Sequence, residues 1–220
     1  RRHSTSQPHG LWRAGAVTTY TTHRGERADI TLPDGSTVTL DVASRLQVPV
    51  DFVGDRTVRL EGEALIHVAH HTGVPFTVLT GEISTRVLGT TFLIRRYATD
   101  TATTVAVRDG KVAVQAVVVA ALQQVASNVR GTSRPAPADL AQFSFATGVL
   151  TLNGVPMPQA IVELDRWYDA DIRFGDDAVR QHVLDATFIA GSLSDLSDVL
   201  TLALNVRIVR EGRVLTLYTR

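Results

Sequence analysis

The sequence has 220 residues, which is enough for one large or two small domains. Hydrophobic residues make up 44% of it, charged residues make up 20%, and 22 Lys and Arg balance 22 Asp and Glu. This is the composition of an ordinary globular protein, and it lacks the basic excess expected of a nucleic-acid binder. Because cysteine is absent, disulfides, thiolate metal sites and a cysteine nucleophile are excluded.

No stretch of the sequence looks like a membrane span, which needs roughly 20 consecutive apolar residues. The longest apolar stretch, residues 112–126, is too short and contains three glutamines. The sequence begins with Arg1 and its single methionine is Met157, so we expect a soluble portion of a longer protein. Residues 1–16 are polar and basic, and we interpret them as a mobile lead-in.

The clearest structural signal is a hairpin within residues 30–40. Ile30 and Leu32 alternate with polar residues, and Val38 and Leu40 alternate with threonines. Between them the sequence reads Pro-Asp-Gly-Ser, in which proline presets its own φ, aspartate bonds back to the chain and glycine supplies a positive φ. This pattern predicts two short strands joined by a tight turn.

Similar strand and turn signals recur through residues 17–126, which we assign to a mainly β domain. The strands are expected at residues 17–22, 46–52, 57–60, 64–68, 75–79, 83–87, 92–97, 104–107 and 111–114. Arg-Asp-Gly at residues 108–110 predicts a second hairpin. Residues 116–124 are apolar and either continue a strand or start a short helix. Many short strands with regular turns predict an antiparallel sandwich or a twisted, partly coiled sheet stack.

The character of the sequence changes in its last third. Residues 127–142 are rich in Ser, Pro, Ala and Gly, and we interpret them as a linker. Residues 143–220 are predicted to form a small α+β domain with the element order βαβ–βαββ. Pro156 opens its first helix, and Ser194 is expected to cap the second. The first helix has one apolar face, formed by Ala160, Ile161, Leu164, Trp167 and Tyr168.

Two groups of polar residues in the β-domain each admit a chemical role and a simpler structural one. His67, His70 and His71 have the residue type of a zinc site, but no acid or cysteine lies nearby to complete it, which favours a polar strand end. Glu61 and Glu63 alternate along a strand, which fits paired acid–base carboxylates or, more commonly, a solvated strand edge.

Two pairs in the second domain are equally open to two interpretations. Asp176 and Asp177 fit a calcium site or a helix start, and the missing ligand spacing favours the helix start. Trp167 and Tyr168 fit core packing, with an exposed protein-binding anchor as the alternative. The sequence contains no serine-hydrolase elbow, Walker loop, zincin motif or Gly-rich nucleotide loop. We therefore predict no catalytic, cofactor-binding or metal-binding residues, and no enzymatic activity.

Taken in order, the motifs of the first half resemble those of a known family. The matching segments are residues 25–26, 30–36, 38–41, 43–44, 56–64, 75–78, 87–92 and 107–112. On these segments the chain resembles the periplasmic part of FecR-type regulators, the anti-sigma membrane sensors of the ferric-citrate signalling class. Residues 143–220 resemble that family's C-terminal subdomain, which is similar to the short N-terminal domain of secretins and TonB-dependent transporters. The segments that carry this second resemblance are residues 152–157, 161–168, 188–191 and 198–200.

The resemblance implies a signal relay by protein–protein contact. In such a relay, the N-terminal signalling domain of a TonB-dependent outer-membrane transporter contacts the C-terminal half of the regulator. The regulator then acts on an extracytoplasmic-function sigma factor through a cytoplasmic segment that is absent from this sequence. The resemblance therefore implies a periplasmic domain of a single-pass inner-membrane protein.

Two candidate docking surfaces follow from the element predictions of the second domain. One is the end of the first helix, at Arg166, Trp167 and Tyr168. The other is the last strand, which we expect at a sheet edge and which comprises Val214, Leu215, Thr216, Leu217 and Tyr218. The alternative function is a carbohydrate-binding or hydrolytic periplasmic β-sandwich, with Glu61 and Glu63 or the histidines as its site. A structural β-protein with no signalling role is a third interpretation.

Overall fold

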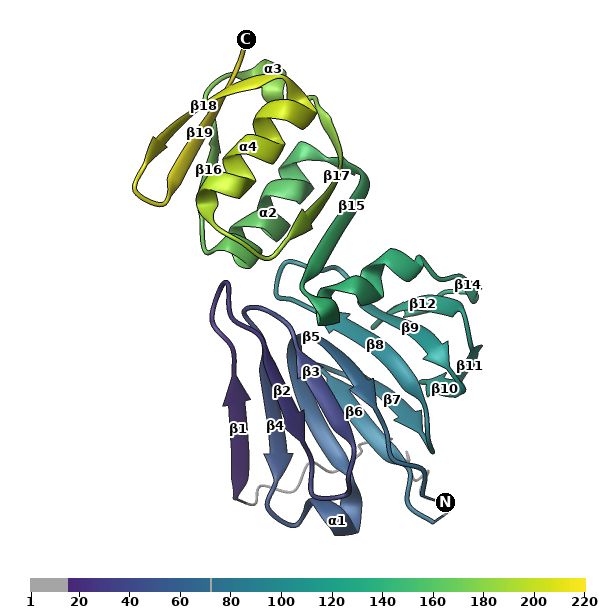
Figure 1. The fold of residues 1–220 in the computed structure, drawn as a ribbon. Helices are drawn as coiled ribbons and strands as arrows, with labels where there is room; N and C mark the ends of the chain where they lie inside the picture. The colour runs from purple at the N-terminus through teal and green to yellow at the C-terminus, as the bar shows by residue number, and fades with distance from the viewer. Residues whose placement is uncertain (1–15, 72) are drawn as a thin grey trace, which may run out of the picture.

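The computed structural model describes residues 16–71 and 73–220, and apart from Ala16 the predicted lead-in lies outside them. The chain forms a mainly β domain followed by a small α+β domain, which confirms the predicted fold class (Figure 1). The first domain contains β1 (Val17–Thr21), β2 (Ala28–Thr31), β3 (Thr37–Leu40), β4 (Arg45–Pro49), α1 (Phe52–Asp55), β5 (Thr57–His67), β6 (Phe76–Thr80), β7 (Ile83–Val87), β8 (Thr91–Arg96), β9 (Thr103–Asp109), β10 (Lys111–Val114), β11 (Val117–Ala120), β12 (Gln123–Asn128), β13 (Gly131–Thr132) and β14 (Ala136–Pro137).

The β-domain is one continuous sheet folded into two layers, and strand β5 belongs to both. The first half of β5 pairs with β4 and β6, and its second half pairs with β3 and β8. One layer has the order β11-β10-β7-β6-β5, with β4 and β1 beyond it, and the other continues from β5 through β8 and β9 to β12. Side chains such as Phe52, Phe76 and Phe92 are fully buried between the layers.

A glycine allows β5 to pass from one layer to the other. The sequence predicts two strands separated by Glu61, Gly62 and Glu63, and this prediction is wrong because β5 runs through all three residues. Gly62 has a φ of +105°, and a Cβ atom there would lie 2.2 Å from Oγ of Ser44. The same Ser44 Oγ accepts a hydrogen bond of 2.9 Å from the amide of Glu63. The bend therefore needs a residue without a side chain.

We expect Gly62→Ala to destabilise the protein by about 3–5 kcal/mol, because the clash with Ser44 adds to the cost of a positive φ. Gly81→Ala is the matched control. Its φ is +60°, but no atom lies within 4 Å of the added carbon, so the cost should be only about 1 kcal/mol. Urea unfolding of both variants measures the difference, and similar costs would show that the close approach to Ser44 is unimportant.

The predicted hairpin at residues 30–40 is confirmed. Strands β2 and β3 pair antiparallel, with Ile30 opposite Val38. In the turn, Asp34 accepts hydrogen bonds from the amide and the hydroxyl of Ser36 at 2.9 and 2.8 Å. The buried Arg56 lies 2.7 Å from the same carboxylate. Burial opposes ionisation of Asp34, but the bonds from Ser36 and Arg56 outweigh it and hold the pKa of this carboxyl below its usual value.

The predicted second hairpin at residues 108–110 is wrong. Strand β9 pairs with β8 and β12, whereas β10 pairs with β7 and β11, so Gly110 carries the chain between the two layers.

Of the two alternatives for residues 116–124, the structure has the strand, interrupted between β11 and β12. The segment interpreted as a linker is partly ordered on the β-domain, because β13 and β14 both pair with β12.

The second domain has the predicted order of strands and long helices, with a short extra helix, α3. Its elements are η1 (Leu140–Thr147), β15 (Val149–Pro156), α2 (Met157–Tyr168), β16 (Asp171–Phe174), α3 (Asp177–Arg180), β17 (Val183–Ile189), α4 (Leu193–Leu204), β18 (Val206–Glu211) and β19 (Val214–Thr219). Helices α2 and α4 lie between the pair β15-β17 and the sheet β16-β19-β18 (Figure 1). Among the described residues, no helix is long and apolar enough to cross a membrane.

Two helix starts test the capping predictions. Asp176 accepts a hydrogen bond of 3.1 Å from the amide of Val179 and caps α3, so the helix-start interpretation is confirmed. The predicted cap at Ser194 is wrong. Ser192 caps α4 instead, in a capping box where its hydroxyl accepts from the amide of Asp195 and the carboxylate of Asp195 accepts from the amide of Ser192.

Candidate functional site

The two candidate clusters of the β-domain do not assemble into reactive sites. His67 Nδ1 lies 2.8 Å from the hydroxyl of Thr91, and His71 Nδ1 accepts from the amide of Gly73 at 3.3 Å. Within the described part of the chain, no three potential metal ligands come together. Glu61 is exposed while Glu63 is buried, so the interpretation of the two as paired carboxylates on one face is wrong.

Of the three predicted docking residues at the end of α2, Trp167 and Tyr168 are buried and Arg166 is partly buried. Trp167 and Tyr168 are each only 7% exposed, so the core-packing alternative is confirmed and the exposed anchor is wrong. Tyr168 belongs to the core of the second domain, where its hydroxyl donates 3.0 Å to the carbonyl of Ile189. Trp167 faces the β-domain, and the guanidinium carbon of Arg27 lies 4.6 Å from its ring centroid.

The last strand is not an edge, which corrects the second docking prediction. Strand β19 lies between β16 and β18 and pairs with both. Leu215 and Leu217 are fully buried. Val214, Thr216 and Tyr218 are partly exposed, and the guanidinium carbon of Arg207 covers the ring of Tyr218 at 4.4 Å. The edges of this sheet are therefore β16 and β18.

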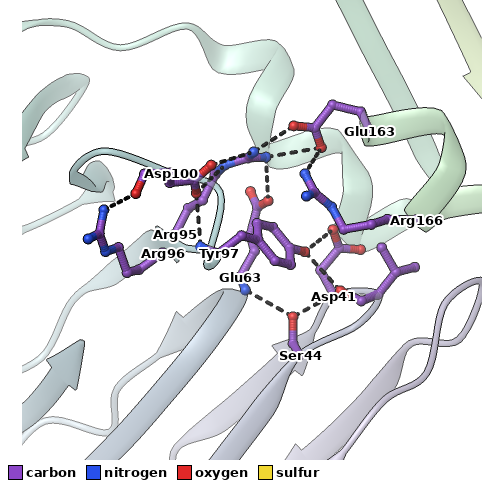
Figure 2. A network of polar contacts seen from close by, with 10 residues as sticks. Asp41, Ser44, Glu63, Arg95, Arg96, Tyr97, Asp100, Glu163 and Arg166 are labelled. Atoms are coloured by element: carbon purple, nitrogen blue, oxygen red, sulfur yellow. Dashed lines mark hydrogen bonds and ion pairs between the residues drawn. The ribbon is translucent and has the colours of Figure 1, made fainter. Parts of the chain in front are cut away.

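The residue around which the two domains meet is Arg95, on β8 (Figure 2). Its Nη1 donates to Glu63 on β5 at 3.2 Å, and its Nε donates to Asp100 at 3.2 Å. Both of these carboxylates belong to the β-domain. Its Nη2 donates to Glu163 on α2 of the second domain at 2.5 Å. One guanidinium therefore joins carboxylates from both domains.

A second guanidinium completes this contact from the opposite side. Arg166 lies one helical turn after Glu163 and is 2.7 Å from it. Its guanidinium carbon lies 3.9 Å from the ring centroid of Tyr97, so the side chain of the second domain stacks on an aromatic ring of the first. The hydroxyl of Tyr97 donates 2.8 Å to the carbonyl of Val42, which holds the ring in place.

The loop between β1 and β2 holds the C-terminal end of α2. The amide of Gly25 donates 2.7 Å to the carbonyl of Arg166, and Arg24 Nη2 donates 2.8 Å to the carbonyl of Asp165. Cations and donors at a helix C-terminus satisfy its free carbonyls and match the negative end of its dipole. Helix α2 is thus fixed to the β-domain along its side and at its end.

Burial changes the protonation of the carboxyl groups in this interface. It raises the pKa of Glu63 to about 8, even though Arg95 lies beside it, because Arg95 divides its charge among three carboxylates. It raises the pKa of Asp41 to about 6. Burial also opposes ionisation of Glu163, but the bonds and charges of Arg95 and Arg166 outweigh it and lower the pKa of Glu163. Glu63 therefore carries a proton near neutral pH, while Glu163 is ionised.

The proton on Glu63 makes stability depend on pH. The folded-state pKa of Glu63, about 8, exceeds the ordinary value of 4.5. The contribution of protonated Glu63 to the unfolding free energy is therefore fully present below pH 4.5 and is lost as the pH rises towards 8. Glu63→Gln is neutral at every pH, so we expect its unfolding free energy to fall less across this window. The difference should reach about 2–4 kcal/mol, given about 1.4 kcal/mol per pKa unit. Chemical unfolding from pH 5 to 8 measures it, with the exposed Glu61→Gln as control, and parallel curves for Glu63→Gln and the unmodified protein would contradict it.

Glu163 tests the contact between the domains. Glu163→Gln removes the charge shared by Arg95 and Arg166 and should destabilise the protein by about 1–3 kcal/mol. Because the domains would then be less coupled, we expect calorimetry to resolve two unfolding transitions. The exposed Glu82→Gln serves as the control. A single transition, shifted no further than in the control, would mean that the Arg95–Glu163 pair does not couple the domains.

Sequence reasoning placed Arg166 and Trp167 at a functional surface but missed Arg95, Glu163 and Tyr97. Arg95 meets Glu63 across 32 residues and Glu163 across 68 residues. No local spacing connects positions so far apart. The one signal available in the sequence was Glu163 and Arg166, an i, i+3 pair of opposite charge on the predicted helix.

The chain is similar to known proteins along both of its domains. Residues 18–113 match the family model described as FecR protein. Two crystal structures of candidate anti-sigma factors from Parabacteroides distasonis ATCC 8503 are similar to the chain. One is 28% identical with a TM-score of 0.80, covering 93% of this chain and 100% of that chain. The other is 27% identical with a TM-score of 0.79, covering 92% and 99%. No curated protein matches the sequence. The predicted resemblance to the FecR family is confirmed over residues 18–113. The resemblance of residues 143–220 to the short N-terminal domain of secretins and TonB-dependent transporters stays a prediction.

Proposed function

We propose that this chain, whose residues 18–113 belong to the FecR family, is the signal-receiving part of an anti-sigma regulator. The observation that carries the proposal is the similarity to candidate anti-sigma factors along 93% of the chain, which includes both domains and their arrangement. In this proposal the chain lies in the periplasm, and the whole protein is anchored in the inner membrane. Its partners are a TonB-dependent outer-membrane transporter and an extracytoplasmic-function sigma factor, the latter through a segment outside this sequence.

The interface at Arg95 supports a relay between the domains. The transporter's N-terminal signalling domain binds the second domain, and the signal reaches the β-domain through α2. Helix α2 suits this task because it carries both Glu163 and Arg166, the two charged residues that engage the β-domain at Arg95 and Tyr97. A partner that shifts α2 changes these contacts without having to unfold either domain.

The second domain offers a docking surface other than the predicted one. In the three-stranded sheet the edges are β16 and β18, and β18 is the longer, with six residues against four. Strand β18 presents Val209 near its centre, 37% exposed. We therefore place the transporter contact on β18, by addition of a strand to this edge.

Val209→Asp tests this surface. We expect it to weaken binding of the cognate transporter's signalling domain at least tenfold, because it places a charge in the middle of the β18 surface. Val183→Asp is the matched control, since Val183 is also an exposed valine but lies on β17 in the other sheet. Calorimetric titration measures both affinities. Loss of binding in Val183→Asp alone would move the contact to β17, and no binding by the unmodified chain would contradict the relay itself.

A further inference from the structure

The β-domain has a hollow on its outer face that the relay does not use. Its volume is about 420 Å³, and it lies over β7, β10 and β11. The strand register places Arg86 opposite Ala113, and Ala113 opposite Val118. Because alanine is small, this row of three residues leaves space between the longer side chains at its ends. The hollow is lined among others by His70, Arg86, Leu88, Lys111, Ala113 and Val118.

The segments at Gly89 and Gly110 form one wall of this hollow. A Cβ atom on Gly89 would lie 2.7 Å from Nδ1 of His70, and one on Gly110 would lie 2.9 Å from Oγ1 of Thr90. Both glycines therefore allow segments to approach more closely than other residues would permit. The buried Thr90 donates 2.9 Å to the carbonyl of Lys111 and ties the two segments together. The wall is held in one shape before any ligand arrives, which lowers the entropic cost of binding.

The chemistry of the hollow combines apolar walls with positive charge. Leu88 is 51% exposed and Val118 is 61% exposed, so two aliphatic side chains face solvent around one hollow. Arg86 and Lys111 add two cations from different strands, and among the residues that the structure describes no carboxylate lines the hollow. The chain as a whole has equal numbers of acidic and basic residues, so this local excess of positive charge is not a property of the whole surface. An aliphatic side chain flanked by carboxylates would complement it.

We propose that this hollow is a docking groove for an acidic, leucine-like segment of a partner protein. The aliphatic side chain sits over Ala113 between Leu88 and Val118, and the flanking carboxylates pair with Arg86 and Lys111. A protein segment fits better than a small anion because the cations lie on separate strands with apolar surface between them. The groove lies on the β-domain, so it is independent of the transporter contact proposed for β18.

The chain offers a direct probe of this groove, because Lys111 is its single lysine. Reductive methylation with ¹³C-formaldehyde labels Lys111 and the chain's amino terminus, keeps the positive charge, and gives a lysine NMR signal inside the groove. We expect an acetylated heptapeptide of alternating aspartate and leucine to shift the Lys111 signal in a saturable manner. A peptide of alternating lysine and leucine should leave it unchanged. No saturable shift up to 1 mM of acidic peptide would overturn the proposal.

Variants separate the groove from general electrostatics. Arg86→Glu and Val118→Asp should each lower the affinity for the acidic peptide at least tenfold. Arg130→Glu makes the same charge change at an exposed site outside the groove, and it should change this affinity less than twofold. An equal loss of peptide affinity in Arg86→Glu and Arg130→Glu would overturn the docking proposal. So would an aspartate–glycine peptide that binds as tightly as the aspartate–leucine peptide. Circular dichroism confirms that each variant is folded. Val209→Asp should leave peptide binding unchanged, so failure here and failure of the transporter contact are distinguishable.

Discussion

The guanidinium of Arg95 is the interaction on which the arrangement of the two domains depends. Guanidinium presents five N–H donors in a planar fork, and here they reach Glu63, Asp100 and Glu163. Two of these acceptors belong to the β-domain and the third belongs to α2. In a partly buried site, removing any one charge leaves the others uncompensated, so the cost exceeds that of a surface ion pair. The position of α2 is therefore coupled to the conformation of β5 and β8.

The proton on Glu63 prevents this interface from being overloaded with negative charge. If Glu63 were ionised, Arg95 would have to stabilise three buried or half-buried carboxylates, while Asp41 nearby adds to the repulsion. The contact therefore combines strong individual hydrogen bonds with a balance of positive and negative charge that changes when Glu63 gains or loses its proton. A change of a few kcal/mol in the stability of such an interface is within the range that a docking partner with unequal affinity for two arrangements can supply.

The parts of the fold that local chemistry determines could be predicted from the sequence. Alternation and turn residues predict the hairpin at residues 30–40, and apolar periodicity predicts α2 with its buried face. The failures were pairings and contacts set by distant residues. Gly62 reads as a break between two strands, yet β5 runs through it, at a point where Ser44 leaves no room for a side chain. Gly110 reads as a hairpin turn, yet it joins two layers because β9 finds its partners in β8 and β12. The candidate site failed for the same reason, since Arg95 has partners 32 and 68 residues away.

The burial of Trp167 and Tyr168 changes what α2 can do. As an exposed anchor, the end of this helix would bind a partner directly, but Tyr168 packs in the core of the second domain and Trp167 lies against Arg27. The helix therefore has one face in its own core and charged residues engaged with the β-domain. A short helix with intact hydrogen bonds moves nearly as a rigid unit, so a shift of the second-domain core must also move Glu163 relative to Arg95. In the proposed relay, α2 would therefore transmit a displacement, and the partner that causes it would bind elsewhere on the second domain.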